Sequence, residues 1–295
     1  MKRILFLIII SLIFSCKKLV EKKTKKNLQL ESITNINANG ANETDIIIDE
    51  LVDEELVVIK KLKAGTVDNE NDFYEIFRNN RENKLEKLNK LEENLLSQYV
   101  NFYNENGKQI FPDSVKIKIE RFKKAKIEFW EIGEGYTDLR TEPHFYYNLF
   151  QKYVTKDFKE YLKQEAIEET ELYSADAGLA ISFEKIAERA LFWESFLLKF
   201  PNSKMNQKVV EKLELYTTDY LLGLDNTPTY EVSIKDLNAE TIEEFKRFSI
   251  KNPYSKITKL INSFTSKLKN TEIDDLRPII MIEVAETFKQ KNSFE

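Results

Sequence analysis

Several residue types that usually signal a particular chemistry are scarce in this chain of 295 residues. It contains one cysteine, one histidine, seven glycines and six prolines. A single cysteine excludes an intrachain disulfide framework and a thiolate metal site, and a single histidine leaves a metal ion without companion imidazoles. So few glycines and prolines argue against a β-sandwich or barrel, which needs many tight turns. The composition therefore favours a helical class.

Charge is unevenly distributed along the chain, which is long enough for one or two domains with a sizeable core. Residues 1–26 carry a net charge of +7, which leaves −12 on residues 27–295 out of a total of −5. An acidic body is a poor nucleic-acid binder, since phosphate contacts require clustered Lys and Arg. The basic run at 17–26 is typical of a solvated tether, and it can also touch anionic lipid head groups.

The N-terminus has the three-part layout of a secretion signal. Lys2 and Arg3 give a positive start, an apolar run follows over residues 4–14, and the small Ser15 precedes Cys16. The run is well short of the ~20 apolar residues that a membrane-crossing helix needs. We therefore expect residues before the cysteine to be a cleaved leader and not a permanent transmembrane anchor.

Around the cysteine, the sequence resembles the lipobox of bacterial lipoproteins. Ile13 and Ser15 occupy the places, three and one before Cys16, that an aliphatic and a small residue fill in that motif. The resemblance implies that Cys16 becomes the first mature residue and carries acyl chains, and two or three chains hold a protein firmly to a membrane. It also implies an extracytoplasmic lipoprotein, which we expect in the outer membrane of a Gram-negative bacterium. The alternative, a buried or disulfide-bonded cysteine, lacks a second cysteine.

The segment after the cysteine has the composition of a tether. Asn, Thr and Ser dominate residues 27–45, and so few large apolar side chains cannot offset the entropy cost of ordering the chain. Residues 46–65 are more apolar, and their pattern leaves open both a short strand and a helix packed against the body.

Apolar residues recur at spacings of three and four from residue 72 onward, which predicts helices. The first pattern predicts one long amphipathic helix from 72 to 106, ~50 Å in length. Arg81 interrupts its apolar stripe, so packing within the chain is favoured over a coiled-coil dimer. Further helices are expected at 114–130, 145–173, 182–200, 203–222, 238–251, 255–268 and 275–291. Asn238 is a predicted N-cap, Gly223 a left-handed stop and Pro278 a first-turn proline.

A short phrase recurs at three predicted helix ends, as FPDS at 111–114, FPNS at 200–203 and NPYS at 252–255. Proline disfavours helical geometry in the residue before it, and the serine can cap the next helix. The last two copies align further at an offset of 52: Trp193, Phe196, Pro201, Ser203 and Val209 match Phe245, Phe248, Pro253, Ser255 and Ile261. The sequence therefore predicts helical hairpins with corners at these places.

These corners resemble the F-x-x-x-x-P-x-S corner of tetratricopeptide-like bacterial lipoproteins, over roughly residues 182–268. The resemblance implies stacked helix pairs with a concave face for a peptide or protein partner. The residues expected on such a binding face are Trp193, Phe196, Phe245 and Phe248. An irregular helical bundle, which can use the same corner, is the alternative.

The segment FWEIGEGYTDLRTEPHFYY, residues 129–147, is the candidate for chemistry. It contains two of the seven glycines, and glycine lets a backbone approach a ligand closely in loops, which often carry function. The candidate functional residues of this loop, taken as 131–144, are Glu134, Asp138, Arg140, Glu142 and His144.

Two interpretations of the loop remain open. Glu134 as a general acid, with Asp138 or Glu142 as its partner, would follow the two-carboxylate logic of glycoside cleavage. In the structural interpretation, Arg140 pairs with a glutamate, the glycines make the turn and His144 is a partly buried ring.

We therefore expect an all-α protein with a signal peptide at 1–15, a lipidated N-terminus and mostly disordered tether at 16–71, and a helical domain at 72–295. That domain is either an irregular bundle or a tetratricopeptide-like array of hairpins. The expected function is a lipid-anchored scaffold of the cell envelope that binds another envelope protein or a peptide, with no cofactor, no metal and no catalytic residue. An enzyme acting on envelope glycan or peptide through the acidic loop is the alternative, and a structural spacer is a third possibility.

Overall fold

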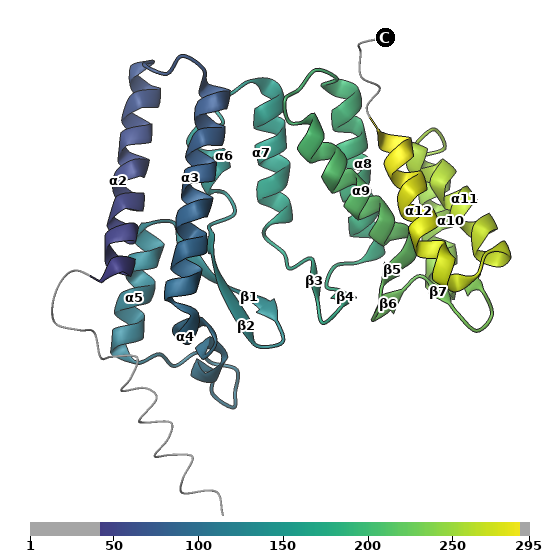
Figure 1. The fold of residues 1–295 in the computed structure, drawn as a ribbon, viewed down its shortest axis with the longest axis horizontal. Coiled ribbons are helices and arrows are strands. Elements are labelled where there is room, and N and C mark those ends of the chain that lie inside the picture. Colours follow the sequence, from purple (N-terminus) through teal and green to yellow (C-terminus); the bar gives the residue numbers. More distant parts are fainter. Residues whose placement is uncertain (1–41, 290–295) are drawn as a thin grey trace, which may run out of the picture. The chain divides into compact units, whose positions relative to one another are not determined.

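The computed structural model describes residues 42–289, which form a mostly helical body with short strand pairs (Figure 1). The helices are α2 (Glu43–Ala64), α3 (Glu70–Leu91), α4 (Glu93–Leu96), the 3₁₀ helix η1 (Tyr99–Phe102), α5 (Asp113–Lys124), α6 (Phe145–Phe150), α7 (Lys156–Glu168), α8 (Phe183–Lys199), α9 (Asn206–Leu222), α10 (Ala239–Lys251), α11 (Lys256–Asn270) and α12 (Ile273–Phe288). The strands are β1 (Ile127–Gly133), β2 (Tyr136–Thr141), β3 (Ser174–Ala175), β4 (Gly178–Leu179), β5 (Gly223–Leu224), β6 (Thr227–Pro228), β7 (Tyr230–Glu231) and β8 (Asp236–Leu237). They pair in chain order into four antiparallel hairpins, each within a connection between two helices.

The predicted helical class is confirmed, but the expectation of an all-α protein is wrong. The helix predicted over 114–130 stops at Lys124, and Lys126 adopts a left-handed conformation with φ 57° before β1 begins. Strand β1 contains a run of β-branched and aromatic residues that pack well on a pleated surface. The described part of the chain shows no tetratricopeptide repeat.

Helix α2 belongs to the helical body, so the tether expected over 16–71 extends too far. Of the two structures left open for residues 46–65, the helix is the one present. It packs against α3 and α5, and Ile47, Ile48 and Leu51 are buried in that contact. The apolar face of this segment therefore finds its partner within the body.

The long helix predicted from 72 to 106 ends at Leu91. The carboxylate of the next residue, Glu92, accepts hydrogen bonds from the Thr44 hydroxyl at 2.7 Å and from the Lys118 ammonium at 2.6 Å. The chain then turns through α4 and η1. The apolar side chains after the turn form a small core cluster of Leu95, Tyr99, Phe102 and Val115. Their spacing continues the pattern of α3, which is why periodicity does not reveal the break.

The helix predicted over 145–173 is also interrupted, between α6 and α7. Asn71, at the start of α3, holds the interruption in place. Its amide nitrogen donates to Oγ1 of Thr155 at 2.9 Å, and its amide oxygen accepts from the Thr155 backbone N–H at 3.1 Å. These residues lie 84 positions apart, so local sequence does not indicate the contact.

The helices predicted between 182 and 268 are confirmed as α8 to α11. The residues that cap α8, α10 and α11 through a side-chain oxygen are Ser182, Asn238 and Ser255. Gly223 ends α9 with the positive φ that was expected, 69°, but its ψ of −173° is extended and not left-handed helical. Pro278 lies inside α12 and not in its first turn, because the helix already begins at Ile273.

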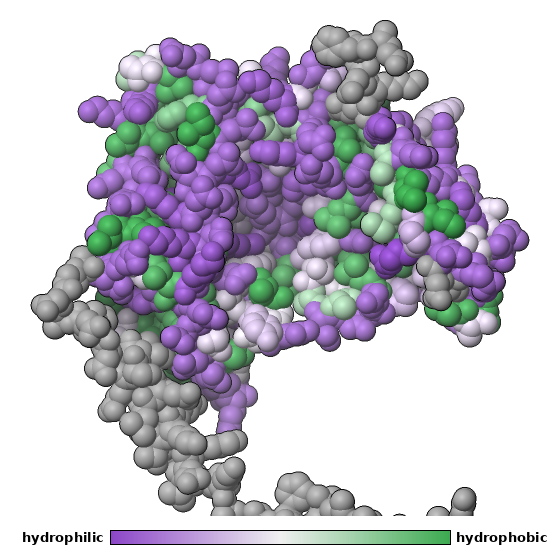
Figure 2. All heavy atoms as spheres, viewed as in Figure 1, coloured by the Kyte–Doolittle hydropathy of each residue, from purple (hydrophilic) through white to green (hydrophobic). Residues whose placement is uncertain are grey.

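The buried apolar side chains of the described residues form three clusters. The largest joins one half of α2 and α3 to helices α6 to α12, and the second joins the other half of α2 and α3 to α4, α5, β1 and β2. The smallest lies around η1. Helices α2 and α3 therefore connect the two larger clusters. The face drawn in Figure 2 is mainly hydrophilic, with small apolar patches and a hollow near its middle that has a hydrophilic lining.

Candidate functional site

The candidate segment at 129–147 is a β-hairpin followed by a helix, and not a loop. Glu134 lies at the tip of the hairpin with φ 51°, between two glycines that also have positive φ. A Cβ atom at Gly133 would lie 2.6 Å from the Cβ of Ala175, so only glycine fits there. The glycines therefore serve the turn and its close packing on β3. Glu134 and Asp138 are both exposed.

Arg140 pairs with a glutamate of the neighbouring strand, as the structural interpretation predicts. Its Nη2 lies 2.7 Å from Oε1 of Glu128, and its guanidinium carbon lies 3.4 Å from the ring centre of Trp130. Both partners are on β1, so these contacts fasten the two strands together.

Glu142 and His144 line a cavity of about 680 Å³ between α2, the base of the hairpin and α6. Glu55 of α2 and Lys126 also line it. Burial raises the pKa of Glu55, and the positive charges of Lys126 and Arg81 act in the opposite direction. His144 is exposed, so the prediction of a partly buried ring is wrong. It directly precedes α6, whose first residues, and not the histidine, turn into the core.

Arg81 is a fully buried arginine close to this cavity, with 0 % of its surface exposed. Its Nε donates to Oγ1 of Thr141 at 3.1 Å, and its Nη2 donates to the carbonyl oxygens of Ala125 and Lys126. The guanidinium carbon lies 4.3 Å from the ring centre of Phe145. Among the described residues no carboxylate forms an ion pair with Arg81, and its Nη1 has no hydrogen-bond partner. Burial lowers its pKa.

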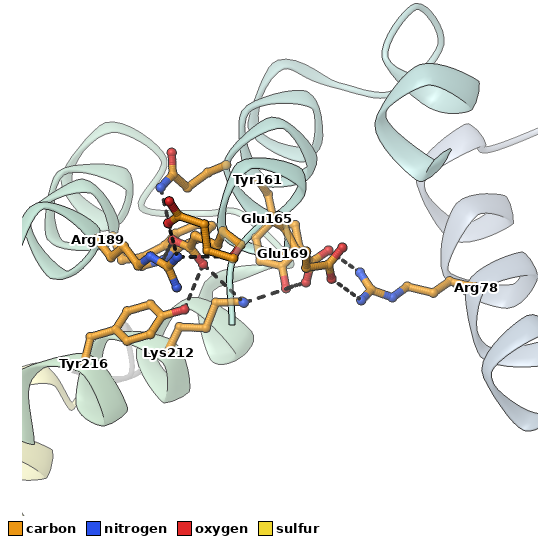
Figure 3. Close-up of polar contacts among 11 residues, drawn as sticks. Arg78, Tyr161, Glu165, Glu169, Arg189, Lys212 and Tyr216 are labelled. Atoms are coloured by element: carbon orange, nitrogen blue, oxygen red, sulfur yellow. Dashed lines mark hydrogen bonds and ion pairs between the residues drawn. The ribbon is translucent and has the colours of Figure 1, made fainter. Parts of the chain in front are cut away.

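A second cluster of charged side chains connects α3, α7 and α9 (Figure 3). Its centre is Glu165 of α7, which is buried. Arg78 of α3 donates to Oε2 of Glu165, the Tyr161 hydroxyl donates to Oε1 at 3.0 Å, and Nζ of Lys212 lies 3.8 Å from Oε1. Burial opposes ionisation of Glu165, but the charges of Arg78 and Lys212 outweigh it and lower the pKa.

Glu168 is the second buried carboxylate of the cluster. Its Oε1 accepts from Nε1 of Trp193 at 2.8 Å, its Oε2 accepts from the Tyr216 hydroxyl at 2.9 Å, and Nζ of Lys212 lies 3.6 Å away. Arg189 of α8 is also buried and donates to the backbone carbonyl of Glu168 at 3.2 Å. Every carboxylate oxygen of Glu165 and Glu168 is thus already bonded within the protein.

Glu169 is the member of the cluster that titrates near neutral pH. Partial burial and the negative charge of Glu165 raise its pKa to about 7. Nη2 of Arg78 lies 4.0 Å from its Oε1, and 38 % of its side chain is exposed. A carboxyl group with a strongly shifted pKa is typical of functional sites, although structural ion-pair networks produce such shifts too.

This cluster around Glu165 and Glu168 was not predicted from the sequence. The signal that could have identified it is the position of Glu165 on α7, where it continues an apolar stripe made of Phe158, Tyr161 and Leu162. A glutamate at a core position requires buried partners, because an isolated buried charge is costly. Sequence alone does not indicate the charged partners of Glu165, Arg78 and Lys212, which lie on two other helices.

The four aromatic residues expected on a binding face are in the core. Trp193, Phe196, Phe245 and Phe248 are all buried in the largest apolar cluster. Their spacing places them on the buried faces of α8 and α10, so these side chains form no exposed aromatic face.

An open groove lies between α7 and α8, and we call it the α7–α8 groove. Its volume is about 410 Å³, and its apolar floor consists of Ile167, Phe192 and Phe200. Its polar lining residues are Lys156, Lys159, Glu160, Lys163, Gln164 and Lys199. A neighbouring hollow of about 320 Å³ shares Gln164, Ile167 and Phe192 with it, so the depression continues along both helices.

Comparison with protein-family models, with curated proteins and with solved structures found no match to this chain. Between residues 42 and 289, no helix combines the length and the apolar character that crossing a membrane requires. The same residues contain no group of three or more His, Cys, Asp or Glu side chains placed to hold a metal ion. Cys16 and the leader lie outside the described residues.

Proposed function

We propose that this protein is a protein- or peptide-binding scaffold, held at the cell envelope by a lipid on Cys16. The observation that supports binding is the α7–α8 groove, whose apolar floor is open to solvent. Ile167 in that floor keeps 48 % of its surface exposed, and two phenylalanine rings beside it are only partly buried. Exposed apolar surface enclosed by polar residues is typical of sites that receive another molecule.

The charged clusters favour binding over catalysis. The carboxylates of Glu165 and Glu168 are bonded to Arg78, Lys212, tyrosine hydroxyls and Trp193, so they stabilise the contacts between helices. Glu134 is exposed at a hairpin tip and does not line the 680 Å³ cavity that contains Glu142. A general acid and its partner must reach the same reacting bond, which these positions do not support.

The lipid anchor is part of the proposal because the lipobox-like sequence before Cys16 provides a mechanism for it. Several acyl chains would keep the helical body at the membrane surface. The envelope location then follows, since lipidation at this kind of signal accompanies export.

The test compares the wild-type protein with Cys16→Ala in the cells that produce it. We expect the wild type in the membrane fraction and the variant in the soluble fraction. A photo-crosslinking amino acid at Phe200 should trap one identified protein, and the same amino acid at the fully exposed Tyr254 should not. An unmodified thiol in the mass spectrum of the mature wild type would refute the anchor. Absence of any adduct at Phe200 would refute the scaffold.

A further inference from the structure

We infer that the α7–α8 groove binds an acidic amphipathic helix of a partner protein. This inference rests on the proposed binding function and specifies the chemistry of the partner.

Three lysines of the rim carry positive charge that the protein does not neutralise. Lys156, Lys159 and Lys163 are exposed on α7, and within the described part of the chain none of them has an ion-pair or hydrogen-bond partner. Lys199, on the α8 side, binds the carboxylate of Glu160 at 2.5 and 2.8 Å. The charged residues of the rim are therefore four lysines and one glutamate, and the pairing of Lys199 with Glu160 leaves three lysines as the local excess of positive charge.

This excess is opposite in sign to the net charge of the body that contains it. Residues 27–295 have a net charge of −12. Several lysines elsewhere are neutralised by a carboxylate within 3.3 Å, as Lys84, Lys118 and Lys208 show. An acidic partner would be repelled by most of this surface and attracted at the groove, so the charge pattern provides orientation as well as attraction.

The shape of the groove fits a helix. Along α7 the α7–α8 groove extends from Lys156 to Ile167, which corresponds to ~17 Å at 1.5 Å per residue. The neighbouring hollow contains Glu171 and Glu188 beside Lys185 and Arg189 and is not part of the proposed site. A helix of three to four turns has this length, and its apolar stripe would cover Ile167, Phe192 and Phe200. Acidic side chains on the flanks of that stripe would face the lysines, as in other helix-in-groove complexes. A flat lipid surface could contact the lysines, but it would not reach the floor between the two helices.

The experiment measures fluorescence anisotropy with the full-length protein in mild detergent. The probe is a fluorescein-labelled synthetic helix of about 15 residues with a leucine stripe and glutamate on both flanks, and the control probe has lysine in place of each glutamate. We expect the acidic probe to bind and the basic probe not to bind. Lys159→Glu with Lys163→Glu should weaken binding about tenfold or more, and added salt should weaken it too.

A matched control reverses two exposed lysines outside the groove, Lys246→Glu and Lys251→Glu on α10, and should leave binding unchanged. Ile167→Ser should weaken binding without lowering the thermal midpoint, since this side chain is half exposed. Equal binding of both probes, or equal effects of the two double reversals, would overturn the inference.

Two further outcomes would also overturn it in favour of another occupant. Vesicles with anionic lipids that bind through Lys159 and Lys163, while the acidic probe does not, would indicate a membrane. Self-association abolished by the same reversal would indicate a second copy of the chain. If crosslinking at Phe200 still traps a protein in cells while the probes show no charge preference, the scaffold proposal stands and only the acidic partner is refuted.

Discussion

Glu165 lies on α7 and Glu169 directly follows the end of that helix, yet their surroundings shift their pKa values in opposite directions. Burial disfavours the charged form of both. Glu165 is compensated by Arg78 and by Lys212, whose Nζ lies 3.8 Å away. Glu169 has only a distant contact with Arg78 and faces the negative charge of Glu165. The protonation of each residue is therefore decided by side chains on other helices.

The raised pKa of Glu169 predicts a pH-dependent contribution to stability. The ordinary value is 4.5 and the folded value is about 7, so the folded state binds the proton more tightly than the unfolded chain. This contribution is fully present below pH 4.5 and is lost as the pH rises through 7. Glu169→Gln should therefore be more stable than the wild type at pH 8, by about 1 kcal/mol because water screens the exposed part of the side chain, and no more stable at pH 4.

Urea unfolding of both proteins at the two pH values measures this difference. Glu286→Gln, at an exposed position of α12, is the control and should change stability equally at both. A Glu169→Gln protein that is less stable than the wild type at pH 8 would contradict the assignment, because it would show that the charged form stabilises the fold.

The sequence predicts part of the environment of Arg81. Its place in an apolar stripe predicts packing within the chain, and its complete burial among residues of this chain agrees. Arg81 donates hydrogen bonds to Thr141 and to the carbonyl oxygens of Ala125 and Lys126, which lie 44 to 60 residues further along the chain. Neither spacing nor composition indicates these partners, since they meet only when α3 packs against the hairpin.

At the scale of elements, the end of α9 combines a local signal with a tertiary constraint. Gly223 was predicted as a left-handed stop, and it does end the helix with a positive φ of 69°, although its ψ of −173° is extended and not left-handed helical. The chain then folds back so closely that a Cβ atom at this position would lie 2.1 Å from the carbonyl oxygen of Thr227. The close approach comes from the pairing of β5 with β6, which the sequence analysis did not include.

Gly223→Ala should therefore destabilise the protein more than the replacement of a glycine that has a positive φ but no close neighbour. A side chain at positive φ costs about 1 to 2 kcal/mol, and the backbone collision should raise the total to about 3 kcal/mol or more. Gly65→Ala is the matched control, since Gly65 has φ 63° with no atom within 4 Å of its added Cβ. Chemical denaturation curves compare the two. Equal losses of stability would show that the collision is relieved without cost.

Helix breaks are the elements that sequence predicted least well. The stripe of α3 continues through Leu95, Tyr99 and Phe102, although the helix ends at Leu91. Apolar residues can keep the same spacing whether the helix continues or is interrupted by a turn after which they are still buried. Periodicity therefore does not distinguish a continuous helix from an interrupted one. The corners near Pro201 and Pro253 were predicted correctly, because proline restricts the residue beside it. Ser255 caps α11 as predicted, but Ser203 does not cap α9, which begins at Asn206 and has no side-chain cap.

At the scale of the whole molecule, α2 and α3 connect the two larger apolar clusters of the described residues. Val58 and Phe77 belong to one cluster, and Leu51 and Leu88 belong to the other. Each helix is continuous through both clusters. If one cluster unfolded alone, α2 and α3 would lose part of the packing that also holds them in the other cluster. We therefore expect the two clusters to unfold together.

The chain contains two tryptophans that can test this coupling, Trp130 on β1 and Trp193 on α8. With Trp130→Phe, fluorescence reports the largest cluster, and with Trp193→Phe it reports the hairpin. In each variant we expect the fluorescence and far-ultraviolet circular dichroism transitions in urea to coincide. A hairpin signal that changes well before the helical signal would show that the second cluster unfolds alone.

The sequence by itself determined the helical class, helices α8 to α11, the capping residues Asn238 and Ser255, and the corners at Pro201 and Pro253. These features depend on backbone preferences and on neighbours within about ten residues, which a linear pattern contains. Only the tertiary structure decided that Trp193 and Phe245 are core residues, that Arg78 meets Glu165 from 87 positions away, and that four lysines surround an apolar groove. Such groups converge through helix packing, whose free energy comes from burying surface and which no local spacing specifies.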